Sequence, residues 1–252
     1  MSKWIMPSLK RGGDVQLFCF PFAGGGASAY RTWLRQHSPR LDVAAVQLPG
    51  RENRIAEPLL HSMDAILGEL VEELALQITG PYAFFGHSLG ARMAFEVART
   101  LHKRGHQLPV HMFVSGSRSP EIPEPRPLHQ LSEERFCEEL GRFGGTPREL
   151  MENPELMALY LPILRADFTV DETYEYNHGD ALPVSITAFC GTDDPEATAQ
   201  EMLGWKHQTT EQFTFKQVTG DHFFIQSQWS YVLDQIEETV KAGGCAEHCI
   251  AM

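Results

Sequence analysis

Gly86-His87-Ser88-Leu89-Gly90 is a Gly-x-Ser-x-Gly string that stands between an apolar run, Tyr82–Phe85, and a segment with helical spacing, Leu89–Lys103. In a strand-to-helix turn of this kind the serine is held in a strained conformation with its hydroxyl exposed, and only very small residues fit two positions before and after it. A phosphate-binding glycine turn is the alternative, but no Gly-x-Gly-x-x-Gly or Gly-Lys-Ser/Thr string is present. The context therefore predicts a nucleophile elbow with Ser88 as the nucleophile.

Strand-like and helical segments alternate on both sides of this turn. The runs expected to be strands are Val15–Phe20, Val43–Leu48, Tyr82–Phe85, Met112–Ser115, Val184–Cys190 and Phe213–Val218. The segments expected to be helices are Ala29–Gln36, the stripe from Ile66 to Ile78, Leu89–Lys103, about Ala197–His207 and Trp229–Lys241. Strands that are apolar along most of their length and alternate with helices indicate a mostly parallel sheet covered on both faces. The sequence thus predicts an α/β protein.

Residues 118–181 interrupt this alternation. They open with the proline-rich Ser119–Pro127 and continue with helical spacing and no strand-like run, and Pro162 should kink the helix that contains it. A helical subdomain with its own core and a lid over a site are two compatible interpretations. We therefore expect a core made of residues 1–117 and 182–252, with residues 118–181 as a helical lid insertion.

A serine nucleophile needs a base and an orienting carboxylate, and candidates for both follow later strands. Gly191-Thr192-Asp193-Asp194-Pro195 and Thr219-Gly220-Asp221-His222 each come directly after an expected strand. The order serine, aspartate, histidine is that of the α/β-hydrolases. We expect Asp194, rather than the aspartate before it, to orient His222. His87 should not be the base, because its side chain leaves the elbow in another direction.

The loop Pro21-Phe22-Ala23-Gly24-Gly25-Gly26 follows the first expected strand. It offers a backbone N–H group where an oxyanion hole needs one, and the N–H of Leu89 at the helix start offers the second. We expect Ala23 and Leu89 to be the donors. A turn that serves only to reverse the chain is the alternative reading of these glycines.

Composition and charge exclude several classes of protein. The 252 residues, 42% of them hydrophobic and 21% charged, suit one compact domain. A net charge of −12, with no basic cluster among aromatics, argues against nucleic acid as a partner. The longest apolar run, Met157–Leu164, is too short to span a membrane, and no export signal is recognisable. We therefore expect a cytoplasmic protein that does not enter a membrane, with a monomer as the default.

The five cysteines are an odd number scattered along the chain, which fits reduced thiols. Cys245, His248 and Cys249 near the end offer only three possible metal ligands, with no second pair at zinc-like spacing. We therefore expect no metal site.

Five strings together resemble the stand-alone type II thioesterases that serve non-ribosomal peptide and polyketide synthases, members of the α/β-hydrolase superfamily. They extend over about residues 15 to 240, and the tail Gly243–Met252 matches nothing in the pattern. The strings are Phe20-Pro21-Phe22-Ala23-Gly24-Gly25, Leu48-Pro49-Gly50-Arg51, Gly86-His87-Ser88-Leu89-Gly90, Leu161-Pro162-Ile163-Leu164-Arg165-Ala166-Asp167 and Gly220-Asp221-His222-Phe223-Phe224.

The resemblance implies an α/β-hydrolase fold and a serine thioesterase. Ser88 would be acylated, with His222 as its base and Asp194 as the orienting carboxylate, while Phe22 and Phe223 would contact the substrate. That substrate would be an acyl group on the phosphopantetheine thiol of an acyl or peptidyl carrier protein, and no metal or other cofactor would be needed. Residues 118–181 would correspond to the family's lid.

Two other functions remain open. A small-molecule carboxylesterase or lipase could use the same triad, and a non-catalytic hydrolase-fold protein could bind a ligand in the same place, although a complete triad argues against the latter. Because the chain is acidic, attraction to an acidic carrier would have to be local. We hypothesise that one or more of four arginines meets the carrier, against the alternative that they are solvated or brace the fold. These are Arg31, Arg35, Arg51 and Arg54.

Overall fold

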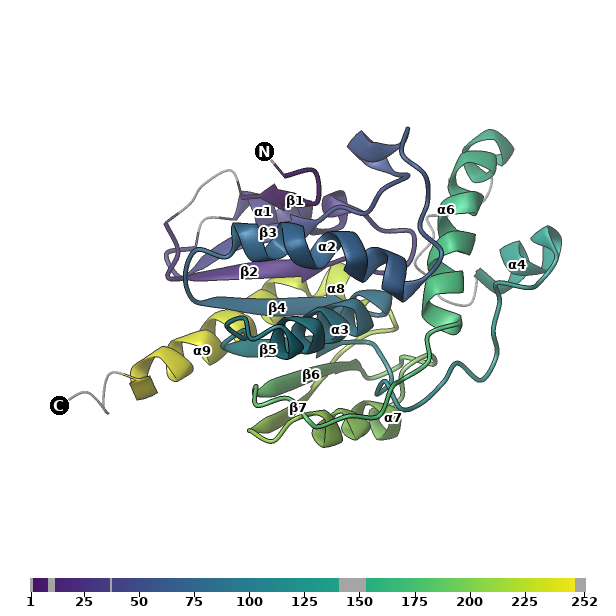
Figure 1. Cartoon of the computed structure of the whole chain (residues 1–252). Helices are drawn as coiled ribbons and strands as arrows, with labels where there is room; N and C mark the ends of the chain where they lie inside the picture. Colours follow the sequence, from purple (N-terminus) through teal and green to yellow (C-terminus); the bar gives the residue numbers. More distant parts are fainter. Residues whose placement is uncertain (1, 9–11, 37, 141–152, 248–252) are drawn as a thin grey trace.

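A computed structural model describes residues 2–8, 12–36, 38–140 and 153–247, with side chains described up to Lys241. Its central feature is a seven-stranded sheet in the order β1-β3-β2-β4-β5-β6-β7 (Figure 1). β1 pairs antiparallel with β3, and the other neighbours pair parallel. The strands are β1 Ile5–Pro7, β2 Val15–Phe20, β3 Leu41–Val46, β4 Tyr82–His87, β5 His111–Ser115, β6 Ile186–Gly191 and β7 Phe213–Val218.

Helices connect these strands. Those before the insertion are η1 Ala27–Tyr30, α1 Arg31–Arg35, η2 Glu52–Arg54, α2 Met63–Gln77 and α3 Leu89–Lys103. Within it lie α4 Glu133–Leu140 and α6 Pro154–Glu172, and after it α7 Ala199–Leu203, η4 Gly204–Gln208, α8 Phe224–Ser227 and α9 Trp229–Glu247. The expected mostly parallel α/β architecture is confirmed.

The sheet is buried on both faces, as the apolar strands predicted. Along β2, Phe18 and Phe20 face one core with the buried sides of α2 and α3, while Leu17 and Cys19 face a second core with α1 and α9. Figure 1 shows α2 and α3 in front of the sheet. The alternation follows from the two-residue period of a strand, and β2 to β7 each contribute to both cores.

The most visible difference from the expected elements is β1, which the sequence did not indicate. Its three residues pair with β3 by joining Ile5 to Val46 and Pro7 to Ala44. Two of the three residues are exposed, so the segment has no buried apolar run from which a strand could be predicted.

The insertion stands at one end of the sheet, beside the start of α3 (Figure 1). Its described part holds a small third core, which includes Phe136 of α4 and Leu164 of α6. α6 begins at an asparagine cap, Asn153, and continues through Pro162 to Glu172, so the expected disturbance at the proline does not end the helix. A helix with buried residues facing both the third core and the main body explains why its sequence is apolar on several faces.

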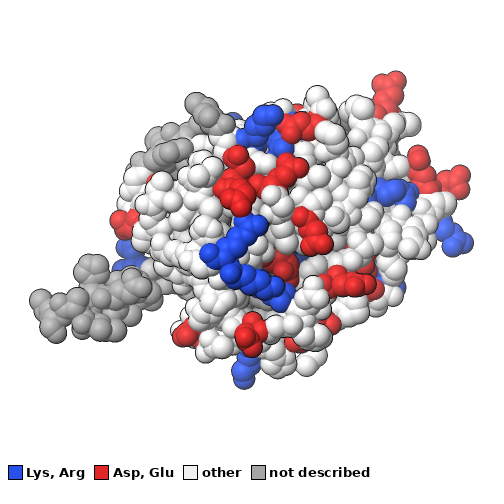
Figure 2. Space-filling view, viewed as in Figure 1, with Lys and Arg blue, Asp and Glu red and all other residues white. Residues whose placement is uncertain are grey.

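Charged side chains are interspersed on the face that carries α2 and α3 (Figure 2). One surface pair there joins Arg104 to Glu72. No helix in the described part of the chain is both long enough and apolar enough to cross a membrane. The tail residues considered above for a metal site, Cys245, His248 and Cys249, lie outside the residues whose side chains are described.

Candidate active site

The turn between β4 and α3 has the geometry of a nucleophile elbow. Ser88 has a φ of 54° and a ψ of −125°, a conformation rare for a residue with a side chain. A Cβ on Gly86 would lie 2.2 Å from the carbonyl oxygen of Gly90, and one on Gly90 would lie 2.1 Å from that of Phe20. Both glycines are therefore required by the close packing of α3 against β4 and β2.

His222 and Asp194 form a buried pair at the carboxyl ends of β7 and β6. The ring Nδ1 lies 2.9 Å from Oδ2 and 3.1 Å from Oδ1 of Asp194, and the two residues are 3% and 7% exposed. Oδ1 also accepts the backbone N–H groups of Glu196 and Ala197. Asp193 instead is exposed and bonded to Thr192. The structure thus brings Asp194, not its neighbour, to His222.

The charge of Asp194 is stabilised in this position. Burial alone would raise the pKa of its carboxyl group, but the hydrogen bond and the charge of His222, with the N–H of Glu196, lower it below the ordinary value. The carboxylate is therefore ionised at neutral pH and can orient the ring of His222 with Nδ1 protonated.

His87 lies behind the elbow, not in the position of a base. Its Nδ1 is 2.9 Å from the hydroxyl of Ser115, and its ring centre is 5.1 Å from that of His222. It is fully buried, and burial lowers its pKa far below the ordinary value, so the ring is neutral. As expected from the direction of its side chain, it packs within the site without facing the cavity that Ser88 lines.

Ser88 and His222 line one cavity between the sheet and the insertion. The rings of Phe22 and Phe223 also line it and meet edge to face, with centres 5.0 Å apart and planes at 84°. On the side of the insertion, α6 contributes further apolar groups to the wall, Tyr160, Leu164 and Phe168. The two phenylalanines expected to contact substrate therefore line the same cavity as the serine and the histidine.

The loop after β2 places its backbone at the same cavity. Ala23 and Gly24 both line it, but the N–H of Gly24 donates to Asp167 Oδ2 over 2.7 Å. The carbonyl of Gly24 accepts the hydroxyl of Tyr160 at 2.6 Å. The N–H of Ala23 has no hydrogen-bond acceptor within the described part of the chain. Leu89, as the first residue of α3, has an N–H without an intrahelical acceptor. These are the two donors expected for an oxyanion hole.

Two of the four arginines considered for carrier contact are buried. Arg51 pairs with Asp167, with 2.8 Å between Nη2 and Oδ1, and donates to the carbonyl of Gly25. Arg54 pairs with Glu57 over 2.7 Å, and its guanidinium lies 4.4 Å from the centre of the Trp4 ring. Each is 4% exposed, which argues against carrier contact by these two and supports the alternative that they brace the fold. Arg31 and Arg35 are exposed, and their contact with a carrier stays a prediction.

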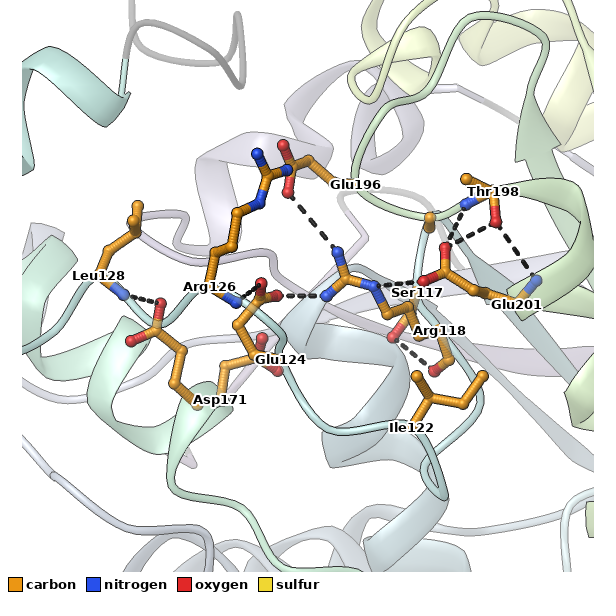
Figure 3. Close-up of polar contacts among 12 residues, drawn as sticks. Ser117, Arg118, Ile122, Glu124, Arg126, Leu128, Asp171, Glu196, Thr198 and Glu201 are labelled. Carbon is orange, nitrogen blue, oxygen red and sulfur yellow. Dashed lines mark hydrogen bonds and ion pairs between the residues drawn. The ribbon is translucent and has the colours of Figure 1, made fainter.

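A charged wall, formed by six residues that also line the cavity, was missed by the sequence interpretation. Its residues are Arg92, Arg118, Glu124, Asp171, Glu172 and Glu196. They come from α3, from the loop after β5, from the insertion and from the loop after β6, and Figure 3 shows part of this wall around Arg118. No local pattern joins these segments, so only the position of Glu196 two residues after Asp194 could have drawn attention to one of them.

Comparison with known proteins identifies clear relatives. Residues 15–240 match the family model described as a thioesterase domain. The chain is 39% identical over 246 residues to a Brevibacillus parabrevis protein named linear gramicidin dehydrogenase LgrE, covering 96% of this chain and 94% of that one. It is 40% identical to the gramicidin S biosynthesis protein GrsT of Aneurinibacillus migulanus, covering 89% of each. Among solved structures, the type II thioesterase YbtT of the yersiniabactin pathway superposes with a TM-score of 0.86 at 32% identity, covering 95% of this chain and 99% of that one.

Proposed function

The chain belongs to the thioesterase domain family, and from that membership we propose that it is a type II thioesterase that hydrolyses acyl groups from the phosphopantetheine thiol of carrier proteins. Its place would be beside a non-ribosomal peptide or polyketide synthase, where it would clear misprimed or stalled carriers. The relatives support this, since YbtT is described as a type II thioesterase of such a pathway and GrsT as a gramicidin S biosynthesis protein.

One observation carries the proposal. Ser88 stands at a strained elbow in the same cavity as His222, and His222 is oriented by a buried, ionised Asp194. A serine hydroxyl is a weak nucleophile until a base takes its proton, and this arrangement supplies the base and its orienting group in the order known for hydrolases. A protein that only bound a ligand would not need all three.

The proposed reaction has two halves. Ser88 Oγ attacks the thioester carbonyl while His222 takes its proton, and the N–H groups of Ala23 and Leu89 stabilise the oxyanion that forms. The carbon–sulfur bond then breaks, and the carrier thiol leaves with a proton from His222. In the second half, His222 takes a proton from water as it attacks the ester carbonyl; the bond between that carbon and Ser88 Oγ then breaks, the free acid leaves, and His222 returns the proton to Oγ. These steps call for no metal or other cofactor.

A thioester suits this apparatus because its thiolate leaves readily. The main barrier is then the formation of the tetrahedral oxyanion, the species that preorganised N–H donors stabilise most. Phe22 and Phe223 would hold the acyl chain. The acyl chamber would be closed by the insertion, since Tyr160, Leu164 and Phe168 of α6 line the cavity, and we propose residues 118–181 as the lid over a core of 1–117 and 182–252.

The proposal includes a monomeric enzyme of the cytoplasm that binds neither nucleic acid nor membrane. The odd number of cysteines fits reduced thiols and so supports a reducing compartment. The net charge of −12 makes a polyanionic partner unfavourable. Arg31 and Arg35, exposed on α1 and close in sequence to the loop after β2, are proposed to meet the carrier.

The test compares one acyl group in three forms. Acetyl would be offered on a carrier protein, as a small thioester and as an oxygen ester, to the wild type, to Ser88→Ala and to Ser227→Ala, which loses a hydroxyl outside the cavity. We expect fastest hydrolysis from the carrier, lost in Ser88→Ala and kept in Ser227→Ala. Preference for the oxygen ester would indicate a carboxylesterase, and no turnover of any form would indicate a binding protein.

A further inference from the structure

The charged wall of the cavity contains more negative than positive charge. Among the lining residues, Arg92 and Arg118 carry two positive charges, whereas Glu124, Asp171, Glu172 and Glu196 are four carboxylates. Arg92 is matched to Asp171, with 3.1 Å between Nη1 and Oδ1. Glu172 accepts the backbone N–H groups of Leu128 and His129 and bonds the ring of His129 at 2.7 Å. The imbalance is therefore concentrated around Arg118.

Arg118 lies within ion-pair distance of three carboxylates. Figure 3 shows it between Glu124, Glu196 and Glu201. Its Nη1 donates to Glu124, and its Nε donates to Glu201 over 3.1 Å. The third carboxylate, Glu196, approaches Nη2 only to 3.7 Å, which is too long for a hydrogen bond. One positive charge thus faces three negative ones, and Glu196 is the least compensated of them.

Glu196 lines the cavity, and one of its two carboxylate oxygens has no hydrogen-bond donor among the described residues. The residue is 6% exposed, and its Oε1 is buried without a hydrogen-bond partner among the described residues. A buried carboxylate oxygen without a donor is unfavourable, so a site of this kind gains from a ligand that brings one. Arg126 extends towards Glu196 in Figure 3, but its side chain is exposed and is not among those that line the cavity.

We propose that Glu196 binds an ammonium group on the acyl chain, so that the cavity selects aminoacyl thioesters over uncharged acyl thioesters of the same shape. The proposal rests on the thioesterase function above and names the substrate class of the same site. An ammonium group would both donate to Oε1 and offset the excess negative charge around Arg118, whereas an amide N–H of the pantetheine arm would only donate.

The position of Glu196 makes it suited to this role. Its backbone N–H donates to Asp194 Oδ1 over 2.8 Å, so the residue is fixed to the aspartate that orients His222. Its side chain lines the cavity together with Ser88, and Phe22, Phe168 and Phe223 line the same cavity. An acyl chain attached to Ser88 could therefore place a methyl group against the aromatic side and an ammonium group against Glu196.

The experiment uses pairs of thioesters that differ only by a charged amino group in place of a methyl group. Alanyl is compared with isobutyryl, and β-alanyl with butyryl, each on the same carrier protein and near pH 7, where most of an α-amino group with a pKa of about 8 is charged. The kcat/KM ratio within each pair is measured for the wild type, Glu196→Gln and Glu201→Gln. Glu201→Gln is the matched control, because Glu201 also pairs with Arg118 but does not line the cavity. Glutamine at this position can keep the capping box with Thr198.

We expect the wild type to favour the amino member of at least one pair, and Glu196→Gln to reduce that preference about tenfold or more, the usual scale for a lost charge-assisted hydrogen bond. Glu201→Gln should leave the ratio within about threefold, a difference near the usual context dependence of such contacts. An equal loss on both members of every pair in Glu196→Gln would mean contact with the pantetheine arm and would overturn the proposal, as would a wild type without amino preference. Failure to hydrolyse any of the four thioesters would instead refute the proposed function.

Discussion

Asp167 of α6 and Arg51 form a buried ion pair that joins the insertion to the catalytic core. The two side chains are 2% and 5% exposed, and the same carboxylate accepts the N–H of Gly24 while the same guanidinium donates to the carbonyl of Gly25. The pair therefore fixes the peptide groups that follow Ala23, the proposed oxyanion donor. Because the N–H of Gly24 donates to Asp167, it is not available to a substrate, whereas the N–H of Ala23 is.

We predict that Asp167→Asn lowers kcat at least about tenfold while KM changes little, since a misplaced oxyanion donor weakens the transition state more than the bound substrate. Stability should fall by about 3 kcal/mol, because Arg51 would keep a buried and unpaired charge. The measurement is steady-state hydrolysis of a small thioester together with urea unfolding.

Glu57→Gln is the control for that experiment. It removes a carboxylate from Arg54, close in sequence to Arg51, without touching the loop after β2. We expect its kcat to stay near that of the wild type. A raised KM with normal kcat in Asp167→Asn would instead assign Asp167 to substrate binding.

The ion pair also shows how far the sequence could be interpreted. The proposed triad could be found because Ser88, Asp194 and His222 each follow an apolar strand and each stand in a short recognisable string. Arg51 and Asp167 also stand in recognisable strings, but they are 116 residues apart, and nothing local indicates that they meet. The sequence therefore leaves Arg51 a candidate for carrier contact, a role that its burial argues against.

The charged wall and β1 were missed for related physical reasons. Glu196 and Arg118 belong to loops after different strands, and their association depends on the parallel order of β5 and β6 in the sheet. β1 has only three residues and two of them are exposed, so its pairing with β3 depends on backbone hydrogen bonds that leave no hydrophobic pattern.

A second prediction concerns the glycines of the elbow. Gly90→Ala should destabilise the protein by at least about 2 kcal/mol, because the new methyl group would lie 2.1 Å from the carbonyl oxygen of Phe20 and that backbone cannot easily move. Gly68→Ala in α2 is the matched control, since a Cβ there meets nothing within 4 Å. It should stabilise the protein by about 0.5 to 1 kcal/mol through helix propensity. Thermal unfolding of both variants would check this, and similar effects of the two changes would contradict it.

A third prediction separates the two adjacent aspartates. Asp194→Asn should lower kcat by about 10⁴-fold, because the amide no longer holds the ring of His222 in the tautomer that can accept the proton of Ser88. Asp193→Asn should change kcat less than about threefold, because the side chain of Asp193 is exposed and accepts the hydroxyl of the neighbouring Thr192. Both variants keep the side-chain shape, so the comparison isolates the charge. Comparable losses in the two would remove Asp194 from the proposed triad.

A fourth prediction concerns the acyl chamber. Phe223→Ala removes a ring that lines the cavity and packs edge to face on Phe22. We expect kcat/KM for acetyl to fall. For a longer chain, such as hexanoyl, kcat/KM should fall less or rise, because additional carbons of the acyl chain can fill the space left by the phenyl ring. Phe215→Ala, on β7 and away from the cavity, is the control and should leave the order of the chains unchanged. An unaltered chain-length profile in Phe223→Ala would argue against its substrate contact.

The last prediction is a loss of stability in mild acid that depends on His111. This residue begins β5, where its Nε2 bonds the hydroxyl of Thr187 at 2.8 Å and its ring stacks on Phe113. Burial lowers the pKa of His111 to about 4, below the ordinary value of 6.5. Between these two pKa values the unfolded chain is protonated at His111 and the folded protein is not. The contribution of His111 to the free energy of unfolding is therefore fully present above pH 6.5 and is lost as the pH is lowered towards 4.

Between pH 7 and pH 5 this histidine should account for about 2 kcal/mol of that loss. In His111→Gln, which can still bond Thr187, the free energy of unfolding in urea should fall by about that much less over the same interval, while the exposed His106→Gln should behave as the wild type. The buried His87, whose pKa is also lowered by burial, acts in the same direction in all three proteins and leaves part of the pH dependence in place. If His111→Gln lost as much stability as the wild type, the acid sensitivity would have to come from His87 and other groups, because the proton uptake by the unfolded chain at position 111 would have been removed without effect.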